Sequence, residues 1–424
     1  MRRAKWWAGG LIGWAALVSL TADWAALVSL AADWPQFLGP RRDGSADDAA
    51  IRTRWPQQGP PRLWRYPLGA GWSGPVVVQG RAYIFHRLKD REVLDCLEVK
   101  TGKRIWRDEL PTDYVDDFNF DDGPRATPAI AGQSIVTLGA SGVLAVRATP
   151  TGQLVWQRNI NRDYDVRKGF FGTATSPLVV GQKVIVNVGG QAKGAGVVAF
   201  DLASGKELWR TAQDEVSYSS PALATIHGEP VAVFLTRAGL LGVGVERGTV
   251  KFARPWRARL HASVNGATPL VRGSQVFVSA SYSTGALLVE VAPDFSLKEL
   301  WKGDDILSCH YNTPVRIGDF LYGVDGRAEA GPDLVCVEWA SGKVRWRQER
   351  FGCAGLITVG RQIVAINDQG EAVVFAADPT AYRELARARV LDGRGPVRAM
   401  PALADGLLLA RDTGQLVCVD LRPE

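Results

Sequence analysis

A short motif recurs along this chain: a Thr or Ser, a Gly directly after it, and a Trp four residues after the Gly. Four copies are complete, one has Phe in place of Trp and one lacks the Gly: Gly102 with Trp106, Gly152 with Trp156, Gly205 with Trp209, Gly342 with Trp346, Gly248 with Phe252, and Trp301 alone. Such a repeat, at intervals of about 40 to 50 residues, is typical of β-propellers, in which each repeat forms one four-stranded blade. The motif therefore predicts an all-β chain, and the 46 Gly suit its many tight turns.

A second signal marks where each blade starts. A Pro with a small or polar residue one or two positions before it precedes an apolar segment at seven places: Pro75, Pro128, Pro177, Pro221, Pro269, Pro314 and Pro401. These prolines lie 44 to 53 residues apart as far as Pro314, and the longer interval before Pro401 has room for two units. The first of those two units would start at residues 353–355 (CAG). The seven prolines and this additional start together predict eight blades.

The last unit ends one strand early, because residues 415–424 stop before any Trp strand. Residues 62–68 (RLWRYPL), near the start, have the pattern of an outer strand. Adding this strand to the last blade would remove an open sheet edge. We therefore predict an eight-bladed β-propeller of four-stranded antiparallel blades over residues 62–424, closed by an N-terminal strand. An extended segment, residues 32–61, would precede it.

The first 31 residues have the pattern of a signal peptide. A basic start is followed by an apolar stretch and by small residues, among them Ser29 and Ala31, that suit cleavage. Residues 14–23 and 24–33 are a near-perfect tandem copy, which we interpret as a local duplication. Export places the chain outside the cytoplasm, in the periplasm or secreted. An uncleaved signal would instead anchor it, although Asp23 makes a membrane span costly.

The charge pattern argues against a nucleic-acid partner. The net charge is +6, from 50 basic and 44 acidic residues, and the basic residues are scattered. Proteins that bind nucleic acids carry a basic patch or stripe instead. We expect a monomer.

The tryptophans and most cysteines of the repeat have a structural explanation. The tryptophans should pack between neighbouring blades: Trp64, Trp106, Trp156, Trp209, Trp301 and Trp346. Cys96, Cys336 and Cys418 occupy one repeat position, which Ala199 fills in the third blade, so we expect buried thiols. Cys309 and Cys353 fall at adjacent blade starts, so they are either free thiols or joined by a disulfide in an oxidising compartment.

An acidic run between the first two blades could hold a cation. In an extended backbone Asp117, Asn119 and Asp121 would point to one side, since they alternate with Phe118 and Phe120. Three oxygen ligands suit calcium. The spacing of Gly123 and the lack of a final Glu depart from a helix-loop-helix calcium loop, which favours a solvated loop instead.

Residues just before each blade start should surround the channel mouth on one face. The set combines aromatic, amide, imidazole and guanidinium groups: Trp72, Arg125, Phe171, Tyr218, His261, Asn265, His310, Asn312 and Arg398. Long loops between second and third strands, residues 189–196, 279–285 and 325–332, share this face. Convergent groups of this kind predict a ligand site. The alternative is that they only satisfy strand ends and channel water.

These repeats resemble the quinoprotein, or pyrroloquinoline quinone (PQQ), propeller family over residues 34–424. Residues 33–40 (DWPQFLGP) and 63–77 (LWRYPLGAGWSGPVV) resemble secreted bacterial PQQ-binding-like proteins. Related groups are the propeller lipoprotein of outer-membrane β-barrel assembly and the quinone-dependent dehydrogenases. The dehydrogenases are expected to carry adjacent cysteines and a calcium ion near the quinone, whereas all five cysteines here are isolated. No Cys precedes Cys96, so the lipid-bearing Cys of the assembly lipoprotein is missing as well.

The sequence carries no nucleophile elbow, phosphate-binding loop or zinc motif. We therefore expect a non-enzymatic envelope scaffold that binds a protein or a small molecule on its long-loop face, without a cofactor. The alternative is a PQQ-dependent oxidoreductase.

Overall fold

The computed structural model describes residues 32–48, 50–261, 263–393 and 395–423. Residues Ala31–Glu424 form one compact unit. The predicted signal peptide, residues 1–31, lies outside the described residues. Within the described ranges no helix is both long enough and apolar enough to cross a membrane.

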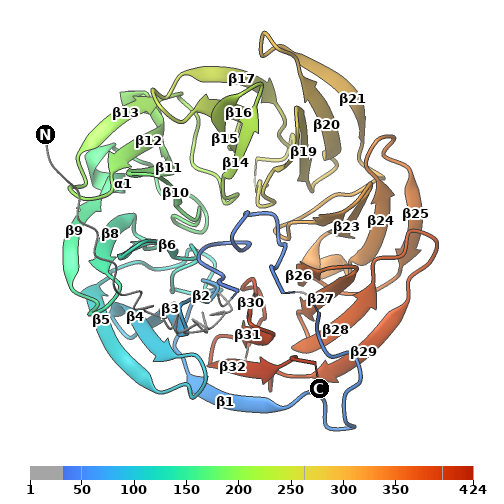
Figure 1. Cartoon of the computed structure of the whole chain (residues 1–424). Helices are drawn as coiled ribbons and strands as arrows, with labels where there is room; N and C mark the ends of the chain where they lie inside the picture. Colours follow the sequence, from blue (N-terminus) through green and yellow to red (C-terminus); the bar gives the residue numbers. More distant parts are fainter. Residues whose placement is uncertain (1–31, 49, 262, 394, 424) are drawn as a thin grey trace, which may run out of the picture. The chain divides into compact units, whose positions relative to one another are not determined.

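The described chain forms eight sheets of four strands, arranged around a central axis as in Figure 1. Blades one to four are β2 (Val76–Val78), β3 (Arg81–Leu88), β4 (Arg91–Glu98), β5 (Arg104–Pro111); β6 (Ala129–Ala131), β7 (Ser134–Leu138), β8 (Val143–Ala148), β9 (Leu154–Asn159); β10 (Leu178–Val180), β11 (Lys183–Gly190), β12 (Ala195–Asp201), β13 (Glu207–Thr211); β14 (Ala222–Ile226), β15 (Glu229–Leu235), β16 (Gly239–Gly244), β17 (Val250–Pro255).

The remaining four blades follow the same order from the axis outward. They are β18 (Leu270–Arg272), β19 (Gln275–Ala280), β20 (Gly285–Val291), β21 (Leu297–Gly303); β22 (Val315–Ile317), β23 (Phe320–Asp325), β24 (Asp333–Glu338), β25 (Val344–Gln348); β26 (Ala354–Val359), β27 (Gln362–Asn367), β28 (Glu371–Ala376), β29 (Glu384–Arg389); β30 (Ala402–Ala404), β31 (Leu407–Arg411), β32 (Gln415–Asp420), β1 (Arg62–Pro67). The described part of the chain also has three single helical turns in loops: α1 (Ile160–Asp163), η1 (Gln191–Lys193) and η2 (Ala328–Ala330).

The predicted blade starts are confirmed. Seven of the innermost strands begin at the residue directly after a predicted Pro, from Val76 after Pro75 to Ala402 after Pro401. The remaining one, β26, begins at Ala354, inside the predicted start. Pro suits this place because each innermost strand is a sheet edge, where a missing backbone N–H leaves no ladder bond unmade.

Ring closure by the N-terminal strand is also confirmed. Strand β1 pairs antiparallel with β32, the last strand of the chain, with Trp64 opposite Cys418. Figure 1 shows β1 lying outside β32, beside the C-terminus. The eighth blade therefore contains both ends of the propeller sequence, and its missing edge is supplied from residues 62–67.

The repeated Gly and Trp join neighbouring blades. The tryptophan ring of one blade lies on the glycine of the next: Trp64 on Gly102, Trp106 on Gly152, Trp156 on Gly205, Trp209 on Gly248, and Trp301 on Gly342. In each pair the indole N–H also donates to a carbonyl of that next blade, as from Trp106 to Thr149 at 3.0 Å. Gly102 has a φ of 69°, a backbone conformation that side chains disfavour. Its place in the motif thus has two causes, the turn and the ring.

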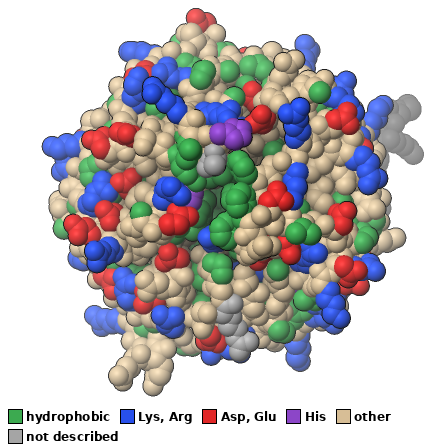
Figure 2. Space-filling model, turned by 180° about the vertical axis from the view of Figure 1, so that it is seen from behind, with side chains coloured by type: hydrophobic (Ala, Val, Ile, Leu, Met, Phe, Trp, Pro, Cys, Tyr) green, Lys and Arg blue, Asp and Glu red, His purple; other side chains and the backbone are tan. Residues whose placement is uncertain are grey.

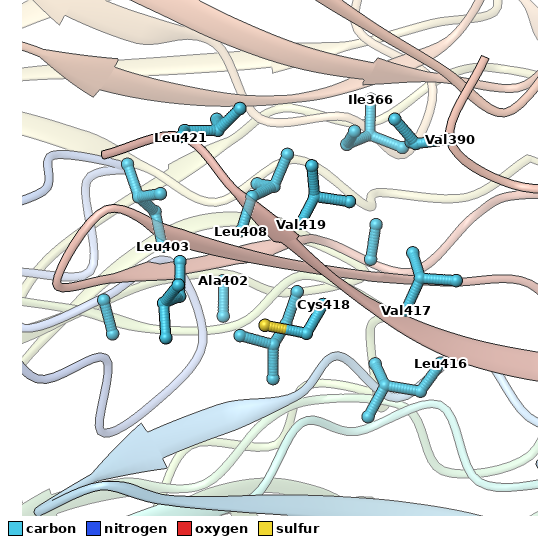
Figure 3. Packing of buried hydrophobic residues seen from close by; sticks show 14 of the residues in the cluster. Ile366, Val390, Ala402, Leu403, Leu408, Leu416, Val417, Cys418, Val419 and Leu421 are labelled. Carbon is cyan, nitrogen blue, oxygen red and sulfur yellow. The ribbon is translucent and has the colours of Figure 1, made fainter. Parts of the chain in front are cut away.

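The repeated cysteines lie in the core opposite these tryptophans. Cys96 faces Trp106 and Cys336 faces Trp346 across their sheets, while Ala199 faces Trp209 in the same register. Figure 3 shows Cys418 among the buried apolar residues of β32, in a cluster that extends to Ile366 of the preceding blade. Burial raises the pKa of the Cys418 thiol to about 12. All five cysteines are free and buried.

The segment before the propeller differs from the extended chain predicted for residues 32–61. Residues 34–48 cross the centre of the ring in Figure 1, and Leu38, Gly39 and Arg42 have positive φ. Bridges from Trp34 to Val77 and from Ser45 to Thr358 fasten the segment to the first and the seventh blade, which flank the eighth. The bends let one side chain of the segment, Arg42, reach into the channel.

Candidate ligand cavity at the channel mouth

A cavity of about 360 Å³ lies at the mouth of the central channel. Figure 2, seen from behind the view of Figure 1, shows a hollow near the middle of this face with hydrophobic side chains around it. Nine of the residues lining the cavity are aromatic: Phe37, Trp72, Phe118, Phe120, Phe170, Phe171, Tyr218, Tyr282 and Tyr311. The volume falls in the range of small-molecule sites, and an aromatic lining is typical of them.

Two kinds of loop build the walls. Loops that lead into a new blade supply Trp72, Arg125, Tyr218, His310 and Arg398. Loops between second and third strands supply Tyr282, Arg327 and Glu329. The expected convergence of both kinds of loop on one face is therefore present in the structure.

The floor of the cavity is closed by the N-terminal segment. Phe37 lines the cavity, and the Arg42 guanidinium donates to the carbonyls of Pro221, Pro177 and Ser176 at 2.7, 3.1 and 3.2 Å. Arg42 is 2% exposed and forms no ion pair with a described residue. Burial without a counter-charge lowers its pKa to about 9. The segment therefore seals the end of the channel away from the mouth.

Arg125 is held rigidly in the wall. It pairs with the buried carboxylate of Asp116 and donates to the carbonyl of Gly123 at 2.9 Å. Its guanidinium lies 4.8 Å from the ring centre of Trp72 and 5.3 Å from that of Tyr114. The loop that follows β5 is thus ordered by a buried ion pair, and Arg125 enters the site already neutralised.

The calcium hypothesis assumed an extended backbone that is absent. Residues 116–119 form a turn, and Asn119 has a φ of 57°. Asp117 pairs with Lys168, whereas Asp121 accepts from the backbone N–H groups of Gly71 and Gly123 at 3.0 and 2.7 Å. The side chains are thus engaged separately, and the described residues contain no group of three or more His, Cys, Asp or Glu placed to hold a metal.

Arg398 differs from the other guanidinium groups of the site. It lies over three aromatic rings, 4.6 Å from the centre of Trp72, 5.5 Å from Phe120 and 5.6 Å from Tyr311. Among the described residues it forms no hydrogen bond and no ion pair. Its donors are therefore unused, although the carboxylate of Glu329 is close enough to interact with its charge.

His310 and Tyr282 form a hydrogen-bonded pair in the wall. The Tyr282 hydroxyl lies 2.9 Å from His310 Nε2, and His310 is 8% exposed. Burial lowers the pKa of His310 to about 4, so its ring is neutral at pH 7. His310 Nδ1 and the indole N–H of Trp72 are buried and have no partner in the described chain.

Not every predicted mouth residue lines the cavity. The Asn265 and Asn312 amides donate to the carbonyls of Thr236 and Ala354, at 2.8 and 2.7 Å, so they satisfy strand ends, as the alternative explanation held. His261 is exposed and its ring lies 6.0 Å from Phe170. The remaining predicted residues do line the cavity: Trp72, Arg125, Phe171, Tyr218, His310 and Arg398.

The sequence reasoning missed several lining residues. Phe118 and Phe120 lie in the same run as the acidic residues; they are 49% and 53% exposed, and their ring centres stack 6.0 Å apart. Phenylalanines in an otherwise acidic loop were the available signal. Tyr282 and Arg327 lie in the long loops between second and third strands. Loop length predicts the face of the site but does not identify the side chains that line it.

Cys309 and Cys353 do not line the cavity. Both are buried free thiols behind its wall, at 0% and 1% exposure. Burial raises the pKa of Cys309 to about 12 and that of Cys353 to about 11. No disulfide joins the two residues in this structure.

Known proteins share this fold. A family model described as outer membrane protein assembly factor BamB matches residues 57–159 and 90–348. The structure of BamB from Moraxella catarrhalis is 15% identical, with a TM-score of 0.59, over 86% of this chain and 98% of that one.

Two further structures are similar. The quinohemoprotein alcohol dehydrogenase ADHIIG from Pseudomonas putida HK5 is 13% identical, with a TM-score of 0.53, over 92% of this chain and 81% of that one. A computationally designed protein, Ika8, is 11% identical, with a TM-score of 0.56, over 84% and 98%. No curated protein matches the sequence. Likenesses at this identity establish the fold.

Proposed function

Because this chain belongs to the PQQ-like β-propeller family whose model is described as outer membrane protein assembly factor BamB, we propose that it is a binding scaffold of the cell envelope. The cavity at the channel mouth would capture a protein or a small molecule. Fold alone leaves the activity open, so the proposal depends on the site.

The observation that carries the proposal is the asymmetry of the channel. One end opens into an aromatic cavity, and the other end is closed by residues 34–48 with Arg42 fixed to three carbonyls. Apart from Arg398, the charged groups and the imidazole of the wall have partners: Asp116 for Arg125, Arg327 for Glu329 at 3.4 Å, and Tyr282 for His310. A site with occupied acids and bases suits binding better than proton transfer.

The cellular location is part of the proposal. The basic, apolar and small-residue pattern of residues 1–31 supports export, and the matching family model is described as an outer membrane assembly factor. N-terminal sequencing of protein from the producing cell should begin near residues 32–34. An intact Met1 on membrane-bound protein would instead support an anchor.

Exposed phenylalanines at the rim allow a test that leaves the core untouched. Native mass spectrometry of protein from the producing cell should detect a copurifying molecule, and the variant Phe118→Ser with Phe120→Ser should lose it. A matched control is Val155→Ser with Leu208→Ser, which removes two apolar side chains of similar exposure, 53% and 46%, from outer strands. Equal retention by both variants, or equal loss, would contradict a binding site at the mouth.

A second candidate is a PQQ-dependent oxidoreductase, favoured by the structural likeness to a quinohemoprotein dehydrogenase. The residues present fit the calcium ion expected of such an enzyme poorly. The amides of Asn265 and Asn312 donate hydrogen bonds to backbone carbonyls, and Asp117 of the acidic run pairs with Lys168. Visible absorption of the native protein and PQQ-dependent dye reduction would decide for this candidate.

A further inference from the structure

We propose that the cavity takes a monoanionic molecule with an apolar body of about one or two rings, and that its anionic group pairs with Arg398. This inference rests on the proposed function, since it names the chemistry of the molecule that the same cavity would capture. It follows from the charges, the stacking and the unpartnered polar atoms of the wall.

The charges of the lining leave one positive charge over. Four lining residues are charged at pH 7: Arg125, Arg327, Glu329 and Arg398. Asp116 neutralises Arg125, and Glu329 neutralises Arg327. Arg398 forms no ion pair among the described residues, and the single charge of Glu329 interacts with both Arg327 and Arg398, so the lining keeps a net positive charge of one. An anion is the ligand that balances it.

Stacking leaves the donors of Arg398 free. A guanidinium group is planar, and its five N–H groups lie in that plane. Trp72, Phe120 and Tyr311 approach Arg398 with their rings, and none of them offers it an acceptor in the observed geometry. Arg42 is the contrast, because its donors are used on carbonyls. Arg398 is therefore oriented but unused, as a preformed anion site requires.

Two further polar atoms in the wall await a partner. The indole N–H of Trp72, in the ring over which Arg398 lies, is a buried donor without a partner in the described chain. His310 Nδ1 is buried in a neutral ring whose Nε2 is already bonded to Tyr282. A ligand whose polar groups reach these two atoms would satisfy them and be oriented by them. Neither atom adds a charge to the cavity.

The rest of the lining sets the body of the ligand. Nine aromatic residues line the wall and floor, so an apolar, ring-containing body would replace water favourably. A molecule with two or three carboxylates would bring charges that no other free lining cation balances, which is costly in such surroundings. The cavity thus favours one anionic group over several.

The experiment compares an acid with its neutral isostere. Indole-3-acetate and indole-3-acetamide differ in one group, and isothermal titration calorimetry on the full chain measures both. We expect the acid to bind about tenfold to a hundredfold more tightly, the range of a charge-assisted hydrogen bond. Benzene-1,3,5-tricarboxylate serves as the polyanion and should bind more weakly than the acid.

Substitutions assign the effect to Arg398. Arg398→Gln should abolish the preference for the acid, and Arg398→Lys should keep part of it. Arg316→Gln is the matched control, because Arg316 also lies over an aromatic ring, 5.9 Å from the centre of Trp339, away from the cavity. A tetrapeptide ending in Phe is titrated with a free and with an amidated C-terminus. Tighter binding of the free form than of indole-3-acetate would identify a polypeptide terminus as the source of the anion, and weaker binding would identify a free acid.

Three outcomes would overturn the inference: equal affinity for acid and amide, a preference that survives in Arg398→Gln, or binding of neither probe. None of them removes the proposed function, which is judged separately by the copurifying molecule and the Phe118 and Phe120 variant. Amide binding as tight as acid binding, for instance, would leave a binding cavity without an anion site.

Discussion

The Trp64 ring lies on Gly102, and its indole N–H donates to the carbonyl of Val99 at 2.8 Å. A Cβ atom on Gly102 would approach Trp64 Cδ2 to 2.6 Å. Trp64 belongs to the last blade of the ring and Gly102 to the first, so this contact fastens the two blades between which the ring closes. The same contact recurs at four other blade junctions, which explains why Gly and Trp recur together in the sequence.

Gly102→Ala should destabilise the closed ring. The added methyl group would clash with the Trp64 ring, and the alanine would have to adopt a φ of 69°, which a residue with a Cβ atom disfavours. We expect the free energy of unfolding to fall by about 2–4 kcal/mol, from overpacking and backbone strain together. Gly80→Ala is the control, because Gly80 has a φ of 72° but nothing within 4 Å of its Cβ position. Equal losses of stability in urea unfolding would contradict the role of the ring contact.

Deleting residues 62–68 should open the eighth blade. The deletion removes β1, leaves β32 as an exposed edge and takes Trp64 from the core. The melting temperature should drop, with a stability loss of several kcal/mol, about that of a buried aromatic residue or more. Leu63→Ala tests the specificity, since Leu63 lies on the same strand and is 40% exposed. A deletion variant that melts at the wild-type temperature would refute closure by β1.

The contacts of these residues show why the fold was predictable from the sequence. Pro75 and Gly102 have local reasons for their identity, an edge strand and a left-handed turn, so the same residues recur in blade after blade. The cavity has no such repetition. Arg125 is placed by Asp116, and Arg42 by carbonyls of residues more than 130 positions away, and neither pairing leaves a periodic signal. Asn265 resembled a site residue because strand ends and ligand sites use the same polar groups.

Cys336→Ala should be tolerated. Cys336 faces Trp346 in the register in which Ala199 faces Trp209, so the blade accepts the smaller side chain there. We expect a loss of about 1 kcal/mol in unfolding free energy, the cost of a small cavity. Burial raises the pKa of this thiol to about 11, so native Cys336 should also react slowly with iodoacetamide at pH 8. Rapid labelling of the folded protein would show that the packing is wrong.

Glu92 should make stability depend on pH. Burial raises its pKa from 4.5 to about 7, and this outweighs the hydrogen bond from the Ala140 N–H and the charges of Arg87 and Arg147. Because the folded-state pKa lies above the unfolded value, the stabilisation is full below pH 4.5 and is lost as the pH rises through 7. Glu92→Gln should therefore gain stability relative to the native protein between pH 5 and 8. Glu109→Gln, at an exposed position, should show no such trend in thermal unfolding.

Arg42→Met should unfasten the floor of the cavity. Met keeps much of the apolar stem but leaves the carbonyls of Ser176, Pro177 and Pro221 without their donors. Removing a buried charge also removes its desolvation cost, so the two effects oppose each other. The unpaired carbonyls should dominate, because three acceptors lose a charged donor at about 1–3 kcal/mol each. We expect a net loss of about 2–4 kcal/mol in unfolding free energy.

The neighbouring arginine provides the comparison for this last prediction. Arg41 is half exposed, pairs with the exposed Asp47, and lies one residue away on the same segment. Arg41→Met should therefore change the melting temperature little, as expected of surface ion pairs. Arg42→Lys should fall between the two, since an ammonium group cannot span carbonyls from two blades as a guanidinium does. If Arg41→Met and Arg42→Met lower stability equally, the segment is held by its bridges at Trp34 and Ser45, and the hydrogen bonds of Arg42 do not stabilise it.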